Sequence, residues 1–135
     1  MRKEQHEEAY KEHLANINKA IEENIVANQR NLGFDISQGS IELFSLYLHQ
    51  LNFLQTSGDQ LDHRVFKSPA LIAKKLPPDF PSKIKILDLM KNIEEERIAL
   101  CYGDRKPKQR IEKAITYFNE LRKIINKEIN DAGTK

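Results

Sequence analysis

Apolar residues recur at steps of three and four along most of this 135-residue chain. In an α-helix such residues share one face, which leaves water only by packing against another element. Four separate stretches show this pattern, and no stretch shows the strict alternation of a half-buried strand. The sequence therefore predicts an all-α fold, an up-and-down bundle of four long helices with one or two short ones.

Residues that favour helix ends divide these stretches. We expect the first helix over residues 4–31, with Gly33 as its cap, and the second over 37–55, with its first serine as the N-cap. The third spans about 82–103, where a glycine ends it, and the fourth spans about 107–130. The second helix is apolar on most of its girth, which predicts burial on several sides.

Residues 56–81 form the irregular part of the chain. We predict a single helical turn at 62–67. Ser68 followed by Pro69 is typical of the start of a short helix, which we expect to end near Lys75. Three prolines then interrupt regular helix. A connection of this length usually carries local structure or function.

The length suits one domain, and we expect residues 1–135 to form it, with a frayed tail at 131–135. No apolar run approaches the ~20 residues that span a bilayer. The first residues are too acidic and polar for a signal peptide. The single cysteine excludes an internal disulfide. These features predict a cytoplasmic protein with no membrane association.

The charge is unevenly distributed, although the formal net charge is only +2. Residues 1–62 carry 5 basic and 10 acidic side chains, whereas residues 63–135 carry 17 basic and 10 acidic ones. This asymmetry indicates an anion-binding face, complementary packing of protomers, or simply a solvated surface of uneven charge.

The third long helix carries the sharpest candidate for function. Its apolar stripe consists of Ile86, Met90, Ile93 and Leu100. Arg97 fills the gap in that stripe, so its guanidinium is expected to face the core side one turn before the helix ends. Arg97 either snorkels out of the stripe, or holds a phosphate together with Tyr102 and the loop that follows.

That loop, residues 104–110, is basic. Its candidate phosphate-binding side chains are Arg105, Lys106, Lys108 and Arg110. No aromatic platform for base stacking is evident beside them, so we expect weak binding of nucleic acid that falls as salt rises.

Other polar residues are weaker candidates. The second helix carries a polar stripe that ends in His49 and Asn52, and a solvated face is its default interpretation. Together with Arg64, these two are candidates for lining a groove. The four histidines lack zinc spacing, and no phosphate loop or dinucleotide fingerprint occurs. We therefore expect no metal and no other cofactor.

The stretch from Arg97 to Asp104, RIALCYGD, resembles the Arg-x4–6-His element of HEPN (higher eukaryotes and prokaryotes nucleotide-binding) domains. The stretches 47–52 and 63–68 are also similar to archaeal HEPN-like proteins. HEPN domains are compact helical bundles, and many are dimeric ribonucleases that cut RNA without a metal. The resemblance carries their arginine onto Arg97 and their histidine onto Tyr102. Tyrosine, with a pKa of ~10, is a poor base at neutral pH, which leaves His63 as a weak candidate for that role.

These observations predict a HEPN-like homodimer that binds RNA or a nucleotide phosphate through Arg97 and the basic loop, with weak or no nuclease activity. The apolar girth of the second helix and the resemblance both favour the dimer. Two alternatives stay open. One is an active metal-independent endoribonuclease that uses Arg97 with Tyr102 or His63. The other is a protein-interaction subunit paired with a nucleotidyltransferase in a toxin–antitoxin system.

Overall fold

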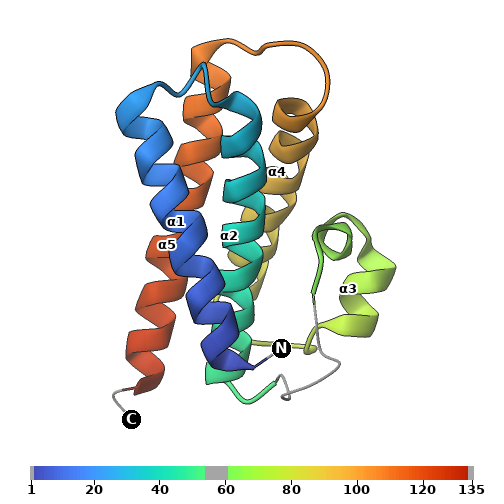
Figure 1. Ribbon diagram of the computed structural model, residues 1–135. Coiled ribbons are helices and arrows are strands. Elements are labelled where there is room, and N and C mark those ends of the chain that lie inside the picture. The colour runs from blue at the N-terminus through green and yellow to red at the C-terminus, as the bar shows by residue number, and fades with distance from the viewer. Residues whose placement is uncertain (1, 54–60, 134–135) are drawn as a thin grey trace.

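The computed structural model describes residues 2–53 and 61–133, which form helices and connections without any strand (Figure 1). The four long helices are α1 (Lys3–Glu23), α2 (Gln29–Gln50), α4 (Lys83–Cys101) and α5 (Lys108–Gly133). The short ones are a 3-10 turn, η1 (His63–Lys67), and α3 (Pro69–Lys75). The predicted all-α fold of four long and two short helices is confirmed.

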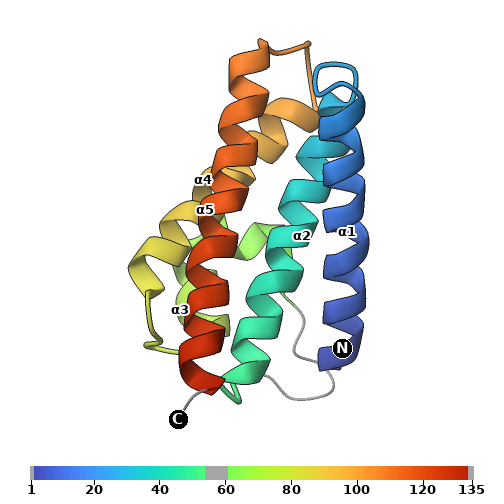
Figure 2. The ribbon, with the colours of Figure 1, turned by 90° about the vertical axis from the view of Figure 1, so that its left-hand side faces the viewer.

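The long helices alternate in direction along the chain. Both ends of the chain lie at one end of the bundle, and the α1–α2 turn and the α4–α5 loop lie at the other (Figures 1 and 2). None of the helices in the described part of the chain is long and apolar enough to cross a membrane.

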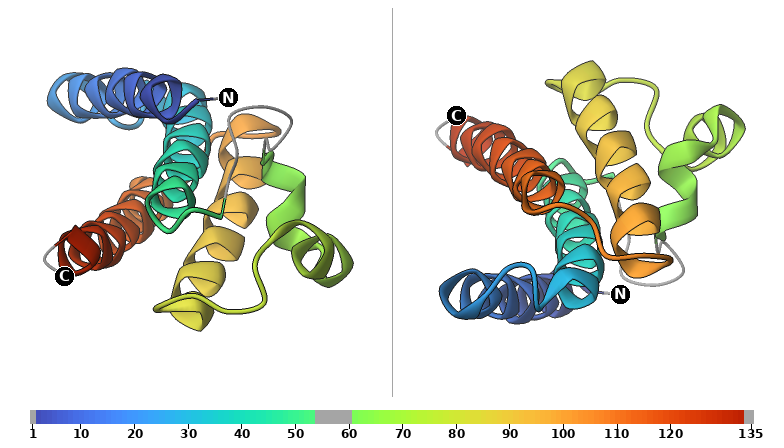
Figure 3. Two further views of the ribbon diagram at one scale, coloured as in Figure 1. Left: turned by 90° about the horizontal axis from the view of Figure 1, so that it is seen from below. Right: turned by 90° about the horizontal axis from the view of Figure 1, so that it is seen from above.

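Helix α2 is the centre of the bundle. It packs against α1, α4 and α5, and α1 and α5 diverge from it on two sides (Figure 3). Its largest side chains, Phe44 and Tyr47, are fully buried. The predicted burial of this helix on several sides is therefore confirmed, and three neighbouring helices of the same chain account for its apolar girth.

The predicted end of the first helix is wrong. Helix α1 ends at Glu23, because Asn24 makes a turn in which its side-chain oxygen accepts from the Ala27 amide at 3.0 Å and its carbonyl accepts from the Asn28 side chain at 2.8 Å. Helix α2 then begins at Gln29, eight residues before the predicted N-cap.

Gly33 and Ser37, assigned to helix ends by their residue types, lie inside α2. A Cβ added to Gly33 would lie 2.8 Å from Leu100 Cβ and 3.1 Å from Cys101 Sγ, so this glycine allows α2 and α4 to approach closely. Ser37 is fully buried and bonds across to α4. At the other end, α2 stops at Gln50, five residues before its predicted end.

The polar stripe of α2 is not a solvated face. Glu42 and Ser45 are buried, and a hydrogen bond of 2.5 Å joins Glu42 Oε2 to His6 Nδ1 of α1. The stripe therefore helps to join α1 to α2.

The shorter elements follow the predicted boundaries. Asp62 accepts from the Arg64 amide at the start of η1, and Ser68 accepts from the Leu71 amide at the start of α3. Gly103, just beyond α4, has a φ of 88°, the left-handed conformation expected of a glycine cap. Helix α5 continues to Gly133, so residues 131–133 belong to a helix and not to a frayed tail, and residues 134–135 lie outside the described part.

Candidate functional site

Arg97 faces α2, as its place in the apolar stripe of α4 predicts. Its Nη1 donates to Ser37 Oγ at 3.2 Å and to Gln38 Oε1 at 3.5 Å. Its Cζ lies 5.4 Å from the centroid of the Phe34 ring, within cation–π distance. Two polar side chains and one aromatic ring, all from α2, thus fix the half-buried guanidinium.

The positive charge of Arg97 has no ion-pair partner among the residues that the structure describes. Its Nε is buried and has no hydrogen-bond acceptor. Burying a guanidinium without an anion costs free energy, and an anion that reaches it recovers part of that cost. The guanidinium is therefore held in place with its charge unpaired and its Nε–H without an acceptor.

One turn before Arg97 on the same helix, Glu94 is only 1% exposed. Ser37 Oγ donates to its Oε1 at 2.5 Å. Burial raises the pKa of the Glu94 carboxyl above its ordinary value, although the Ser37 bond and the charges of His63 and Arg97 act to lower it. Glu94 is thus a buried carboxyl that takes up a proton more readily than a solvated one.

His63 lies beside Glu94. Its Nδ1 is 3.2 Å from Glu94 Oε2, which is an ion-pair distance, but the geometry does not make a hydrogen bond. Helix η1 holds His63 there because Val65 and Phe66 are buried, with Phe66 packing edge-on against Phe44. The structure therefore brings His63, which the sequence could not place, to the carboxyl that lies one turn from Arg97.

Tyr102, the residue at the motif's histidine position, lies elsewhere. It follows the last residue of α4 with extended backbone, and it is 65% exposed. No hydrogen bond joins its side chain to Arg97, although the structure describes both residues. Of the two candidates for an acid–base group, His63 contacts the carboxyl one turn before Arg97, and Tyr102 is exposed at the end of α4.

The basic loop is attached to the end of the bundle. Arg105 Nη1 donates to the Val26 carbonyl at 2.9 Å, and the Lys106 amide donates to Gln29 Oε1 at 2.7 Å. Arg110 forms an ion pair with Glu96 at 3.0 Å. Two of the four predicted phosphate-binding side chains thus already have partners within the chain.

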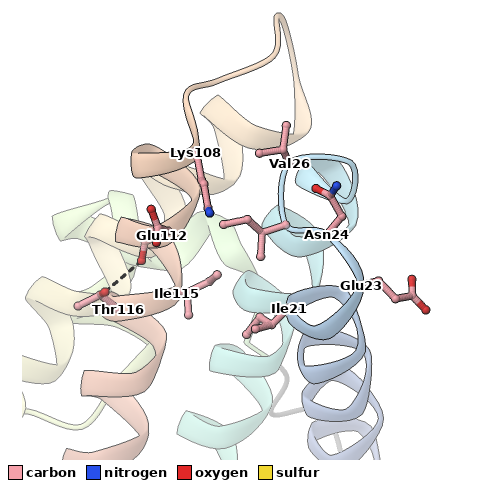
Figure 4. A pocket seen from close by; sticks show the side chains of 9 residues that line it. Ile21, Glu23, Asn24, Val26, Lys108, Glu112, Ile115 and Thr116 are labelled. Carbon is pink, nitrogen blue, oxygen red and sulfur yellow. Dashed lines mark hydrogen bonds between the residues drawn. The ribbon is translucent and has the colours of Figure 1, made fainter.

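Lys108 points to a different part of the surface. It lines a cavity of about 730 Å³ between the end of α1, the α1–α2 turn and the start of α5, where Ile21 and Ile115 form apolar walls (Figure 4). The loop therefore does not gather its cations around Arg97.

Two residues that the sequence analysis did not single out do lie near Arg97. Phe34 is 40% exposed and carries the guanidinium contact described above. Arg30, one turn earlier on α2, donates through Nη2 to the Gly103 carbonyl at 3.3 Å. Arg30 and Arg97 both act to lower the pKa of the Cys101 thiol, which burial raises, so both charges lie near this thiol. Arg30 and Phe34 are four residues apart and share a face of α2. The sequence analysis placed residue 30 in the first helix, so it did not relate these two residues.

Two of the three groove-lining candidates, His49 and Asn52, lie at the end of α2 and beyond it, more than ten residues from the Arg97 contacts at Ser37 and Gln38. His49 packs its ring 5.2 Å from that of His6, and Asn52 follows the far end of α2 with a left-handed φ of 63°. Arg64 is exposed and pairs with Asp62. No group of three or more metal-ligating side chains is found in the part of the chain that the structure describes.

Comparison with protein-family models, with curated proteins and with solved structures finds no match to this chain. The interpretation of the site therefore depends on its own geometry.

Proposed function

We propose that this chain binds RNA or a nucleotide through a phosphate held by Arg97. The observation that carries the proposal is the half-buried guanidinium, which is oriented by Ser37 and Gln38 and has no ion-pair partner within residues 2–53 and 61–133. A phosphate accepts from a guanidinium through two parallel bonds, which makes arginine the preferred residue for such a contact.

Arg30 is the second cation of the proposed site. It lies on the same end of α2 and α4 as Arg97, and its bond to the Gly103 carbonyl, at 3.3 Å, is longer than the bond of Arg105 to the Val26 carbonyl, at 2.9 Å. Arg110 is paired with Glu96. We therefore assign the phosphate contact to Arg97 and Arg30, with Lys106 and Lys108 as outlying charges. The resemblance to HEPN domains supports the same choice of arginine, since Arg97 lies near the end of the penultimate long helix.

The test is binding of a fluorescently labelled single-stranded RNA to Arg97→Met. Loss of a charge-assisted hydrogen bond of about 1.5–3 kcal/mol weakens binding roughly 10- to 150-fold. The matched control is Arg122→Met, because Arg122 also lies over an aromatic ring, Phe118, and donates to a hydroxyl, that of Tyr10. Equal affinity of Arg97→Met and the unaltered protein, with the fold intact, would overturn the proposal.

A second candidate function is RNA cleavage without a metal, which the position of His63 favours. A nearby carboxylate that faces Nδ1 favours the tautomer that carries its proton there, which leaves Nε2 free to take a proton. In this reaction His63 accepts the 2′-hydroxyl proton and the 2′-oxygen attacks the phosphorus. The bond from phosphorus to the 5′-oxygen breaks, the 5′-oxygen takes a proton from water, and a 2′,3′-cyclic phosphate remains, while Arg97 stabilises the charge on the phosphoryl oxygens. Cleavage in the presence of a chelator that is lost in His63→Asn supports it. If the unaltered protein does not cleave RNA, the cleavage function is excluded and only the binding proposal stands.

The homodimer and the nucleotidyltransferase-type partner stay predictions. The apolar girth of the second helix, which favoured a dimer, is covered by α1, α4 and α5 of the same chain. The dimer therefore depends on the resemblance to HEPN domains alone. Light scattering at micromolar concentration decides it, because a mass of one chain would contradict the dimer.

A further inference from the structure

A hollow of about 430 Å³ lies between α1 and the start of α2, on the surface that continues from Arg97. Its walls are formed by Asn16, Lys19, Ala20, Glu23, Asn28, Asn31, Phe34 and Asp35. Phe34 belongs both to this hollow and to the Arg97 site, because the same ring contacts the guanidinium. The hollow and the proposed phosphate contact are thus neighbours joined by one aromatic residue.

The side chains of the hollow suit a flat ligand with polar edges. Three of them are asparagines, whose amides both donate and accept hydrogen bonds. Asn28 donates from Nδ2 to the Asn24 carbonyl at 2.8 Å, which fixes the direction of its Oδ1. Asp35 is held by His13 Nδ1 at 2.9 Å. A partly exposed aromatic ring beside oriented donors and acceptors is the combination that binds unpaired nucleobases.

Charge decides which part of a nucleotide enters. The hollow holds two carboxylates, Glu23 and Asp35, and one ammonium, that of Lys19, which lies 4.0 Å from Glu23. This surplus of negative charge disfavours a phosphate in the hollow, whereas an uncharged base is not repelled. The phosphate is attracted to Arg97, whose guanidinium contacts the Phe34 ring, and to Arg30.

We propose that the hollow binds an unpaired nucleobase, stacked on Phe34, while the phosphate attached to that nucleoside contacts Arg97. This inference rests on the proposed function, since it takes the Arg97 phosphate contact as its second anchor. The ligand is a nucleoside phosphate with an accessible base, which occurs as a free nucleotide or within single-stranded RNA. Duplex RNA, whose bases are stacked and paired, does not fit the hollow.

The test compares adenosine 5′-monophosphate with ribose 5-phosphate by calorimetry. Stacking of the base makes the nucleotide bind about fivefold or more tightly. In Phe34→Leu this advantage disappears. Because the substitution also removes the ring contact of Arg97, the quantity compared is the ratio of the two affinities and not the affinity for ribose 5-phosphate alone. Phe53→Leu is the matched control, because Phe53 is exposed to a similar degree at the far end of α2. Comparison of adenosine 5′-monophosphate with a short single-stranded RNA separates the two sources of the ligand, and the same RNA as a duplex tests whether the base must be unpaired.

A second measurement does not depend on Phe34→Leu folding. The chain contains no tryptophan, so Phe34→Trp creates a single emission reporter on the wall of the hollow. Adenosine 5′-monophosphate quenches this emission and ribose 5-phosphate does not.

The outcomes separate this inference from the proposed function. Equal affinity for the nucleotide and ribose 5-phosphate, with both lost in Arg97→Met, would overturn the base site and leave the phosphate site intact. Tighter binding of the duplex than of the single strand would also overturn it. Absence of binding by nucleotide, ribose 5-phosphate and RNA alike would overturn both proposals.

Discussion

Gly33→Ala tests whether the close approach of α2 and α4 sets the geometry of the Arg97 site. The new Cβ would lie 2.8 Å from Leu100 Cβ, against an optimal carbon–carbon separation of about 3.5–4.0 Å. Leu100 Cβ is fixed to the α4 backbone and cannot rotate away, so the two helices must separate by roughly 1 Å. Overpacking of this kind costs about 1–3 kcal/mol, whereas alanine in place of glycine within a helix stabilises by about 0.8–1.0 kcal/mol.

The net expectation is a loss of about 0–2 kcal/mol of unfolding free energy, read from urea denaturation followed by circular dichroism. For a chain of this length, each 1 kcal/mol corresponds to about 3–5 °C in Tm. Gly39→Ala is the control, because its Cβ would meet His13 Cβ at 3.3 Å and the Phe118 ring at 3.5 Å, contacts that a small shift relieves. The reasoning fails if Gly33→Ala is as stable as Gly39→Ala. Helix separation also displaces Ser37 from Arg97 and Glu94, so RNA binding by Gly33→Ala is expected to weaken as well.

Three further predictions concern the charges of the site. Because the pKa of Glu94 is raised in the folded protein, its contribution to stability is present below its ordinary value of 4.5 and is lost as pH rises through the raised value. Glu94→Gln should therefore gain stability relative to the unaltered protein as pH increases from about 4.5, and a gain in the opposite direction would contradict the burial argument. If RNA contacts only Arg30 and Arg97, a plot of the logarithm of its affinity against the logarithm of salt concentration should have a slope of about −1.4. The slope is measured by titration at several salt concentrations. A slope several times steeper would show that the basic loop also contacts RNA. Tyr102→His should add little cleavage of labelled RNA, because position 102 lies on the surface beyond α4, and strong metal-independent cleavage by this variant would show that the motif position is catalytic after all.

Local patterns predicted what depends on local structure. The stripes of three- and four-residue steps identified every long helix, and the gap in one stripe correctly turned Arg97 toward α2. The serine–proline start of α3 and the left-handed Gly103 were also recognised, since capping depends on a few consecutive residues. Neither result required knowledge of which helices are neighbours.

The error at residues 24–33 arose because glycine has two uses in helical proteins. Gly33 was taken as a helix cap, but in the structure it is a contact point between two helices, and the chain turns at Asn24 instead. An asparagine within a polar, helix-compatible run gives little warning of a turn. The mistake removed Arg30 and Phe34 from the second helix, and it hid the only aromatic ring that contacts Arg97 among the residues described.

The polar partners could not be found from spacing, because each one comes from a distant part of the chain. His6 meets Glu42, His13 meets Asp35, and His63 meets Glu94, always through Nδ1. Two of these pairs join α1 to α2: the His6–Glu42 pair is buried between the helices, and in the partly buried His13–Asp35 pair the carboxylate also lines the hollow. The third differs, because its histidine is 40% exposed and its carboxylate lies one turn from an unpaired guanidinium. Because of this difference in exposure, the proposed cleavage uses His63 rather than the histidines of α1.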